Sequence, residues 1–258
     1  MKKIAIAVVA LFVIIAVAGF ALVNLRGDAP EEFGLTTEEE AAEASDTDAE
    51  DTAEDTEEAD DSAEADDTAE ADDSTEEAAE AGEVVLDGTW AVADGSEAGY
   101  RVVEDLGDVL DFEAVGRTSQ VTGSIDVAGT SIDAGSFEVD IASITSDDER
   151  RDGQFAGDIM NAAEYPTATL VLTQPIPLGA APEAGTTVET EAVGDLTLRG
   201  VTNSATFPVM AQLLGDQVEI VASIDVLFSD YGIANPSNPF VTVRDEGVVE
   251  VRLLLEKG

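Results

Sequence analysis

The sequence contains no cysteine and no histidine among its 258 residues. Without cysteine there can be no disulfide, no thiolate nucleophile and no cysteine zinc ligand. Without histidine there can be no Ser-His-Asp triad and no imidazole ligand to haem or metal. We therefore expect no cofactor and no metal site, and the enzyme alternative that we keep is acid–base work by carboxylates.

Basic residues are scarce as well. The chain has 11 Lys and Arg against 57 Asp and Glu, which gives a formal net charge of -46. After residue 83 only two basic residues, Arg150 and Arg151, are adjacent. Because phosphate backbones are bound by clustered Lys and Arg, we expect no nucleic-acid partner.

The N-terminal residues form the one long hydrophobic run. Ile4–Val23 is uninterrupted and long enough to cross a bilayer core of about 30 Å. Lys2 and Lys3 precede the run and carboxylates follow it, which predicts a cytoplasmic N-terminus. We expect residues 1–26 to be a single-pass anchor that leaves the rest of the chain on the extracytoplasmic side of the cell membrane.

A cleaved signal peptide is the alternative for this segment. Ala16-Val17-Ala18 has the small-x-small pattern of a cleavage site, and cleavage would give a secreted or periplasmic protein. We favour the anchor because apolar residues continue beyond that site to Val23. Both alternatives export the remainder of the chain.

Residues 27–83 form an acidic segment of low complexity. No basic residue occurs between Asp28 and Glu83, and residues 59–76 repeat a six-residue unit as ADDSAE, ADDTAE and ADDSTE. Few large hydrophobic residues are present and like charges repel along the chain, so we expect a disordered linker. We predict that it is a solvated spacer lifting the folded domain off the membrane; weak binding of calcium or magnesium stays open.

Residues 84–258 show the period-two alternation of strands. Apolar residues alternate with polar ones within 137–141, 196–199, 207–213, 218–228 and 249–256. One apolar and one polar face are typical of antiparallel strands that close around an interior. We therefore predict an all-β fold, an antiparallel lipocalin-like β-barrel, with a surface loop over 173–191 and a long connection at one barrel end over 229–247.

One segment departs from this alternation. Asp152–Ala163 places Phe155 and Ile159 four residues apart, with Met160 beside them, as on one face of a short helix. We expect this helix to form a flexible apolar lid at one end of the barrel, because methionine adapts readily to its neighbours. Trp90 is the only tryptophan, and we expect it to plug the barrel at one end.

The order and spacing of three motifs carry a family resemblance. Val139-Asp140 leads to Ser146–Asp152, Tyr165–Ala168 reads YPTA, and Gly194–Thr202 reads GDLTLRGVT. At these residues the chain resembles the YceI-like family of polyisoprenoid-binding, lipocalin-like domains, from Thr89 to the final strand. The resemblance implies an extended barrel whose apolar tunnel holds a long isoprenoid chain, in an exported protein.

The chain departs from the family at two places. Arg199 and Gln154 stand where the family often has histidine, so any polar role of those histidines is filled differently here. Ile159 and Met160 stand where the family often carries paired phenylalanine. Both replacements are apolar, so a lining role is retained.

Strand parity and the resemblance together nominate the site residues. The expected apolar lining of the ligand site consists of Phe112, Phe137, Val139, Ile141, Phe155, Ile159, Met160, Leu170, Leu172, Leu196, Leu198, Phe207, Val209, Ile224, Val226 and Phe228. The expected polar rim consists of Arg151, Asp152, Tyr165 and Arg199. For Arg150, Arg151 and Asp152, however, we favour an Arg–Asp pair that caps the helix over a role at the rim.

The leading functional hypothesis is a membrane-tethered, extracytoplasmic lipid-binding module. It would hold a polyisoprenoid or similar long amphiphile, such as a quinone, and would catalyse nothing. One alternative is a hydrolase that uses a pair among Asp147, Asp148, Glu149 and Asp152 as acid and base. Another is a structural surface domain whose barrel is filled by its own side chains.

Overall fold

The computed structural model describes residues 29–37, 86–105, 111–179, 185–239 and 241–258. The predicted anchor and nearly all of the acidic segment lie outside these ranges. Within them, no helix is long and apolar enough to span a membrane.

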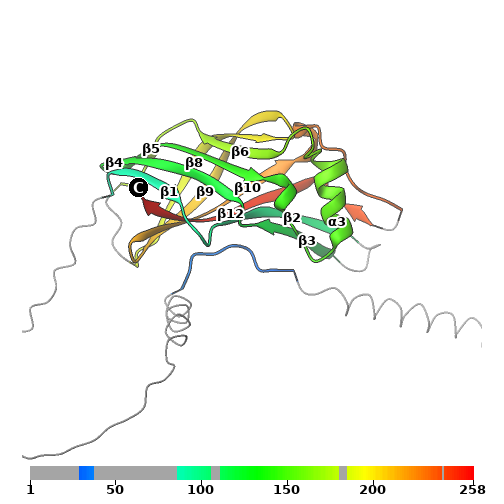
Figure 1. Ribbon diagram of the computed structural model, residues 1–258, viewed down its shortest axis with the longest axis horizontal. Helices are drawn as coiled ribbons and strands as arrows, with labels where there is room; N and C mark the ends of the chain where they lie inside the picture. Colours follow the sequence, from blue (N-terminus) through cyan, green and yellow to red (C-terminus); the bar gives the residue numbers. More distant parts are fainter. Residues whose placement is uncertain (1–28, 38–85, 106–110, 180–184, 240) are drawn as a thin grey trace, which may run out of the picture. The chain divides into compact units, whose positions relative to one another are not determined.

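The described residues form one antiparallel sheet that closes on itself (Figure 1). Its strands are β1 (Gly88–Val92), β2 (Glu97–Asp105), β3 (Asp111–Thr118), β4 (Val121–Ala128), β5 (Ser131–Asp140), β6 (Thr167–Leu172), β7 (Ile176–Pro177), β8 (Val188–Leu198), β9 (Val201–Leu214), β10 (Gln217–Leu227), β11 (Thr242–Val243) and β12 (Glu246–Lys257). The circuit runs β1-β4-β5-β6-β8-β9-β10-β12 and closes where β12 pairs with β1, with Trp90 opposite Lys257. This confirms the predicted all-β antiparallel barrel.

Strand β12 is long enough to have two neighbours on the same side. Its C-terminal end pairs with β1, and its N-terminal half pairs with β2 from Val248 opposite Arg101 to Arg252 opposite Glu97. Strand β2 in turn pairs with β3 along its whole length. Thus β2 and β3 extend the barrel wall beyond β1 and β4.

The barrel interior follows the predicted strand parity. Along β12, Leu253 and Leu255 are buried, and along β10 Ile220, Ala222 and Ile224 are buried. Leu253 lies opposite Ile220 across the ladder. Burial of one face of each strand removes apolar surface from water, which is the main stabilising contribution in such a sheet.

The helical segment starts earlier than predicted and changes character. Helix α3 (Glu149–Gln154) begins three residues before the expected Asp152, because Asp148 is the N-cap and accepts a hydrogen bond from the Arg150 amide. It continues as η2 (Phe155–Ile159), a π-helical turn. Figure 1 shows α3 at one end of the barrel and the C-terminus at the other.

Two predicted loops contain more structure than expected. Strand β8 begins at Val188 inside the expected loop 173–191, because its backbone pairs with β9 from Val188 opposite Ala211. The stretch 229–247 contains β11 and most of η3 (Phe228–Tyr231), and it includes the start of β12. A short 3-10 turn, η1 (Ile141–Ser143), follows β5.

Candidate ligand-binding site

The barrel interior is hollow. Three apolar cavities of about 130, 80 and 40 Å³ occur in it. The two larger cavities share the lining residues Val139, Ala168, Leu198 and Val249. The second and third share Ile125, Ile132 and Ile220. The three therefore lie in series and become smaller with distance from the helical segment.

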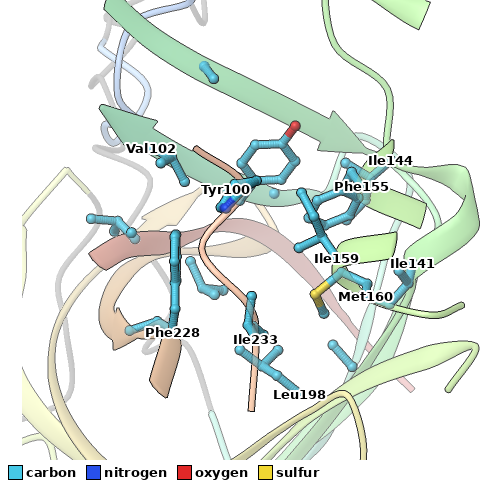
Figure 2. Close-up of a pocket in the computed structure, with 18 of the residues that line it drawn as sticks. Tyr100, Val102, Ile141, Ile144, Phe155, Ile159, Met160, Leu198, Phe228 and Ile233 are labelled. Carbon is cyan, nitrogen blue, oxygen red and sulfur yellow. The ribbon is translucent and has the colours of Figure 1, made fainter. Parts of the chain in front are cut away.

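The largest cavity lies under the helical segment. Figure 2 shows Phe155, Ile159 and Met160 on one side of it, with Phe228 and Ile233 across from them. Phe155 at the start of the π-turn and Met160 at its end are buried, whereas helix α3 buries no residue. The turn, and not the α-helix before it, supplies the apolar cover.

Small residues at inward positions leave the space open. Ala98 and Ala114 line the largest cavity from β2 and β3, and Ala168 lines it from β6. At Gly116 a Cβ atom would lie 2.5 Å from Cε1 of Tyr100, so glycine lets that ring lie against β3. A larger residue at any of these positions would occupy the space or push a neighbour into it.

The smallest cavity ends at the only tryptophan. Trp90 is 2% exposed, lines this cavity, and donates from its indole nitrogen to the Leu86 carbonyl at 2.8 Å. The Lys257 ammonium lies 6.0 Å from the centre of its ring. Trp90 thus closes the narrow end of the barrel, at the site where a plug was predicted.

Polar groups gather on the wall of the largest cavity. Among its lining residues, Glu104 and Arg151 are the only charged ones, and their Oε1 and Nε atoms lie 3.8 Å apart. Arg151 also pairs with Asp147. Burial raises the pKa of the Tyr100 hydroxyl above its ordinary value, so this group stays neutral at physiological pH.

Arg151 stays charged in this setting. Burial acts to lower the pKa of its guanidinium, but the hydrogen bond to Asp147 and the charge of Glu104 outweigh that effect and raise it. The cavity therefore presents one neutral hydroxyl and one fixed ion pair beside an otherwise apolar surface. Such a site suits a long hydrocarbon that ends in a small polar group.

A family model for the YceI-like domain matches residues 93–255. The chain belongs to the YceI-like family. This confirms the resemblance drawn from the three motifs. The match spans the barrel from the end of β1 into β12 and includes every residue that lines the two larger cavities.

Solved structures of similar fold include a polyisoprenoid-binding domain from Saccharophagus degradans implicated in plant cell wall breakdown. It is 16% identical, with a TM-score of 0.52 over 66% of this chain and 98% of that one. BcnA of Burkholderia cenocepacia is 20% identical, with a TM-score of 0.48 over 61% and 95%. The Campylobacter jejuni YceI protein is 17% identical, with a TM-score of 0.42 over 60% and 88%. The likeness to the Saccharophagus degradans domain shows the fold. No curated protein matches the chain.

In this YceI-like domain the predicted lining residues come together, with one exception. The first or second cavity is lined by Phe137, Val139, Ile141, Phe155, Ile159, Met160, Leu170, Leu172, Leu196, Leu198, Phe207, Val209, Ile224, Val226 and Phe228. Phe112 is half-buried and lines none of the three cavities. On β3, Phe112 precedes Ala114, the residue of this strand that lines the largest cavity, by two positions. Phe112 therefore shares the inward parity of Ala114 but lies past the end of the cavity.

The predicted polar rim is only partly correct. Of its members, Arg151 alone lines a cavity. Asp152 instead accepts hydrogen bonds from the Ser146 amide at 2.8 Å and hydroxyl at 2.6 Å, which fixes the turn before α3. The capping role that we favoured for Arg150–Asp152 is also wrong, since the N-cap is Asp148.

Tyr165 and Arg199 lie at the β8–β9 turn, away from the cavities. The Tyr165 ring packs so closely on Gly200 that a Cβ there would lie 2.4 Å from Cε1 of the ring. Arg199 has a positive φ of 50° in this turn and donates a hydrogen bond to the Gly232 carbonyl. The two residues that connect β8 to β9, Arg199 and Gly200, both have the left-handed backbone that a two-residue hairpin connection requires, and Tyr165 packs against this turn from outside it.

Sequence reasoning missed Tyr100 and Glu104. The signal was present, since Ala98, Tyr100, Val102 and Glu104 alternate along one face of β2. Glu104 breaks the apolar pattern of that face, and a charge at an inward position is uncommon unless it is paired. Its partner Arg151 is distant in sequence, so the pairing appears only in the fold.

Three carboxylates of the cluster at the start of α3 make structural contacts, and the fourth, Glu149, is exposed. Asp148 caps the helix and pairs with Arg150, whose hydrogen bond lowers the pKa of that carboxyl. Asp147 pairs with Arg151, and Asp152 accepts from Ser146. Glu104 is the only carboxylate among the residues that line the three cavities of the described chain. The acid–base pair that the hydrolase alternative requires is therefore not assembled in these cavities.

Proposed function

We propose that this YceI-like barrel holds a polyisoprenoid or similar long amphiphile, with its hydrocarbon along the cavities and its polar end near Tyr100 and Arg151. The observation that carries the proposal is the series of three apolar cavities with shared walls. A row of small apolar spaces fits a thin, flexible chain better than a compact ligand. The polyisoprenoid-binding domain of similar fold supports the same class of ligand.

Burial of hydrocarbon supplies the binding free energy. Each Å² of apolar surface removed from water contributes about 25 cal/mol, so a long chain binds without polar contacts along its length. Apolar cavities of about this size stay dry and accept hydrocarbon ligands. The Tyr100 hydroxyl and the Arg151–Glu104 ion pair at the wide end then set which end of the amphiphile lies there, because covering polar groups with hydrocarbon removes their contact with water and is unfavourable.

The cavities must widen to admit a long chain. A drug-sized ligand ordinarily occupies a pocket of about 300–1,000 Å³, whereas the largest cavity here measures about 130 Å³. The π-turn with Phe155, Ile159 and Met160 is the part of the wall suited to move, because π-turns have strained hydrogen bonding and methionine repacks readily. We expect ligand entry beneath this turn.

We also propose that the domain is tethered to the cell membrane on its extracytoplasmic side. The apolar run Ile4–Val23, preceded by Lys2 and Lys3 and followed by carboxylates, supports an anchor in that orientation. Cleavage after Ala18 would instead release a secreted or periplasmic domain. In either form the module would sequester or carry a lipid and not transform it.

Organic extraction of the purified full chain, followed by mass spectrometry, tests the lipid proposal. We expect a co-purifying isoprenoid lipid, or uptake of added geranylgeraniol when the protein is purified empty. Ala168→Phe should abolish both co-purification and uptake of lipid, because residue 168 lines both larger cavities and the larger side chain would fill them. Val171→Phe is the matched control, since Val171 is 43% exposed on the same strand. A wild-type chain that carries no lipid and takes up none would overturn the proposal.

A further inference from the structure

The outer face of β2, β3 and β12 carries charged side chains that are buried. Tyr100 and Val249 line the cavity, so their neighbours Arg101 and Glu250 point out of the barrel. Yet the side chains of Arg101 and Glu250 are only 6% and 2% exposed. The outer face of a barrel strand normally meets water, so this face is covered.

These two buried charges belong to a network with Glu113 and Arg117, whose side chains are more exposed. Arg101 donates from Nε to Glu250 at 2.6 Å and from Nη1 to Glu113 at 2.6 Å. The Nη2 atom of Arg117 lies 3.4 Å from the second carboxylate oxygen of Glu250. Each guanidinium has five N–H donors, and these carboxylates satisfy only some of them. The remaining donors need acceptors from whatever covers the face.

A short peptide from the N-terminal part of the chain supplies one further acceptor to each of the two arginines. Arg101 donates from Nη2 to the carbonyl of Pro30 at 2.8 Å, and Arg117 donates to the carbonyl of Glu31. The Arg117 guanidinium also lies over the ring of Phe33, 3.8 Å from its centre. A planar guanidinium suits both interactions, because it can hydrogen-bond at its edge and stack on its face.

We infer that residues 29–35 (APEEFGL) are an internal docking peptide for the outer face of β2, β3 and β12. Phe33 and Leu35 are half-buried, whereas Glu31 and Glu32 are exposed. Recognition therefore uses two backbone carbonyls and one aromatic ring, and not the acidic side chains. Pro30 favours an extended backbone, which presents consecutive carbonyls to the two arginines.

Docking changes the role of the acidic segment. The peptide ends at Leu35 and the barrel starts at Leu86, so in sequence most of the acidic segment lies between the docked peptide and the barrel, and not between the apolar run and the peptide. Only residues 24–28 then separate the apolar run Ile4–Val23 from the docked peptide, a span of at most about 18 Å at the reach of an extended chain. We therefore propose that the barrel is held close to the anchor, in place of the spacer arrangement predicted above. The docking stands independently of the proposed function, but the closeness to the membrane rests on its tether.

A spin label at residue 34 tests the docking. Gly34→Cys introduces the only cysteine of the chain, and a Cβ at this position meets no atom within 4 Å. With the isotopically labelled full chain in lipid nanodiscs, we expect the nitroxide to broaden amide signals around Arg101 and Arg117. A second substitution, Phe33→Ala, should abolish the broadening. Glu32→Ala is the matched control, because Glu32 is exposed on the same peptide, and it should leave the broadening unchanged.

Two outcomes overturn the inference. An absence of broadening in the Gly34→Cys chain shows that the peptide does not dock. Broadening that arises only when spin-labelled and isotopically labelled chains are mixed shows that the peptide binds a second copy. Lipid extraction from Phe33→Ala separates this inference from the proposed function, since lipid content should stay at the wild-type level.

Energy transfer tests the consequence for the tether. With a donor dye on Val171→Cys and acceptor dyes on lipid head groups, Phe33→Ala should reduce transfer by letting the acidic segment extend. Glu32→Ala should leave transfer unchanged. Equal transfer in wild type and Phe33→Ala would overturn the close attachment even where docking itself is observed.

Discussion

The ring of Tyr100 stacks on the ring of Phe155, with centroids 4.4 Å apart and planes inclined by 20°. This contact joins strand β2 to the π-turn that covers the largest cavity. Because the cover must move to admit a long ligand, the strength of this stack should control how readily the cavity opens. Tyr100 thus acts both as cavity wall and as the partner of the cover.

The first prediction concerns that stack. Tyr100→Ala removes a contact of about 0.5–1.5 kcal/mol beyond its buried area, so a bound lipid should exchange several-fold faster. Tyr100→Phe keeps the ring and should exchange at the wild-type rate. Release of a fluorescent prenol analogue into vesicles measures both. Equal release from all three proteins would show that the stack does not control opening.

The second prediction concerns alkaline pH. Burial raises the pKa of Tyr100 in the folded chain above its ordinary value of 10.0. Below about pH 10 the hydroxyl is neutral in both folded and unfolded chains, so its contribution to stability is fully present. Above that pH only the unfolded chain ionises, and the free energy of unfolding should fall by up to about 1.4 kcal/mol per pH unit.

Urea unfolding at a series of pH values measures this slope. Tyr100→Phe should flatten it above about pH 10, because the phenyl ring has no proton to lose. Tyr165→Phe is the comparison, since Tyr165 lies outside the cavities and its pKa is raised mainly by its hydrogen bond to Glu164. A slope that Tyr100→Phe leaves unchanged would contradict the assignment.

The third prediction concerns the buried charge network. Glu250→Ala leaves Arg101 without its principal partner in a buried setting, which should lower the free energy of unfolding by about 3–5 kcal/mol. Arg150→Ala removes an ion pair whose arginine side chain is 93% exposed, and it should leave unfolding unchanged within error. Urea unfolding of both variants measures these changes in the free energy of unfolding. Comparable losses of unfolding free energy in Glu250→Ala and Arg150→Ala would argue against the burial of Arg101 and Glu250.

The fourth prediction concerns the space beneath Tyr100. Gly116→Ala places a methyl group 2.5 Å from Cε1 of the Tyr100 ring, so the ring must shift into the cavity. We expect lower lipid content per protein by mass spectrometry, together with a loss of stability of about 1–3 kcal/mol from overpacking.

Gly153→Ala is the matched control for that substitution. No atom lies within 4 Å of a Cβ at Gly153, which is part of helix α3. This change should raise stability by about 0.5–1 kcal/mol through helix propensity and leave lipid content unaltered. Lipid loss in Gly153→Ala, or none in Gly116→Ala, would contradict the proposed use of this space.

Much of the site could be predicted because strand parity has a local cause. Successive side chains of a strand point to opposite faces, so the alternation around Val139 or Ile224 indicates inward residues without knowledge of the fold. Phe112 shows the limit of this reasoning. Its parity is inward, but whether it reaches a cavity depends on how far the wall extends along β3, and the pattern does not encode that extent.

The helical segment shows a second limit. Its apolar spacing correctly nominated Phe155, Ile159 and Met160, but it did not reveal that Asp148 is the cap or that a π-turn replaces the α-helix at Phe155. A cap depends on which of several adjacent acidic residues adopts the extended backbone that precedes a helix. The sequence pattern does not distinguish Asp148 from its acidic neighbours in this respect.

Alternation, composition and motif order were enough to establish an antiparallel barrel of the YceI-like family with an apolar interior, because each depends on residues close together in the chain. The polar groups at the wall of the largest cavity, the cavities themselves and the docking of residues 29–35 could be identified only from the folded structure. Arg151 meets Glu104, and Arg117 meets Phe33, across separations of 47 and 84 residues. Such contacts are decided by how strands pack and by which buried charges need partners, and no local pattern carries that information.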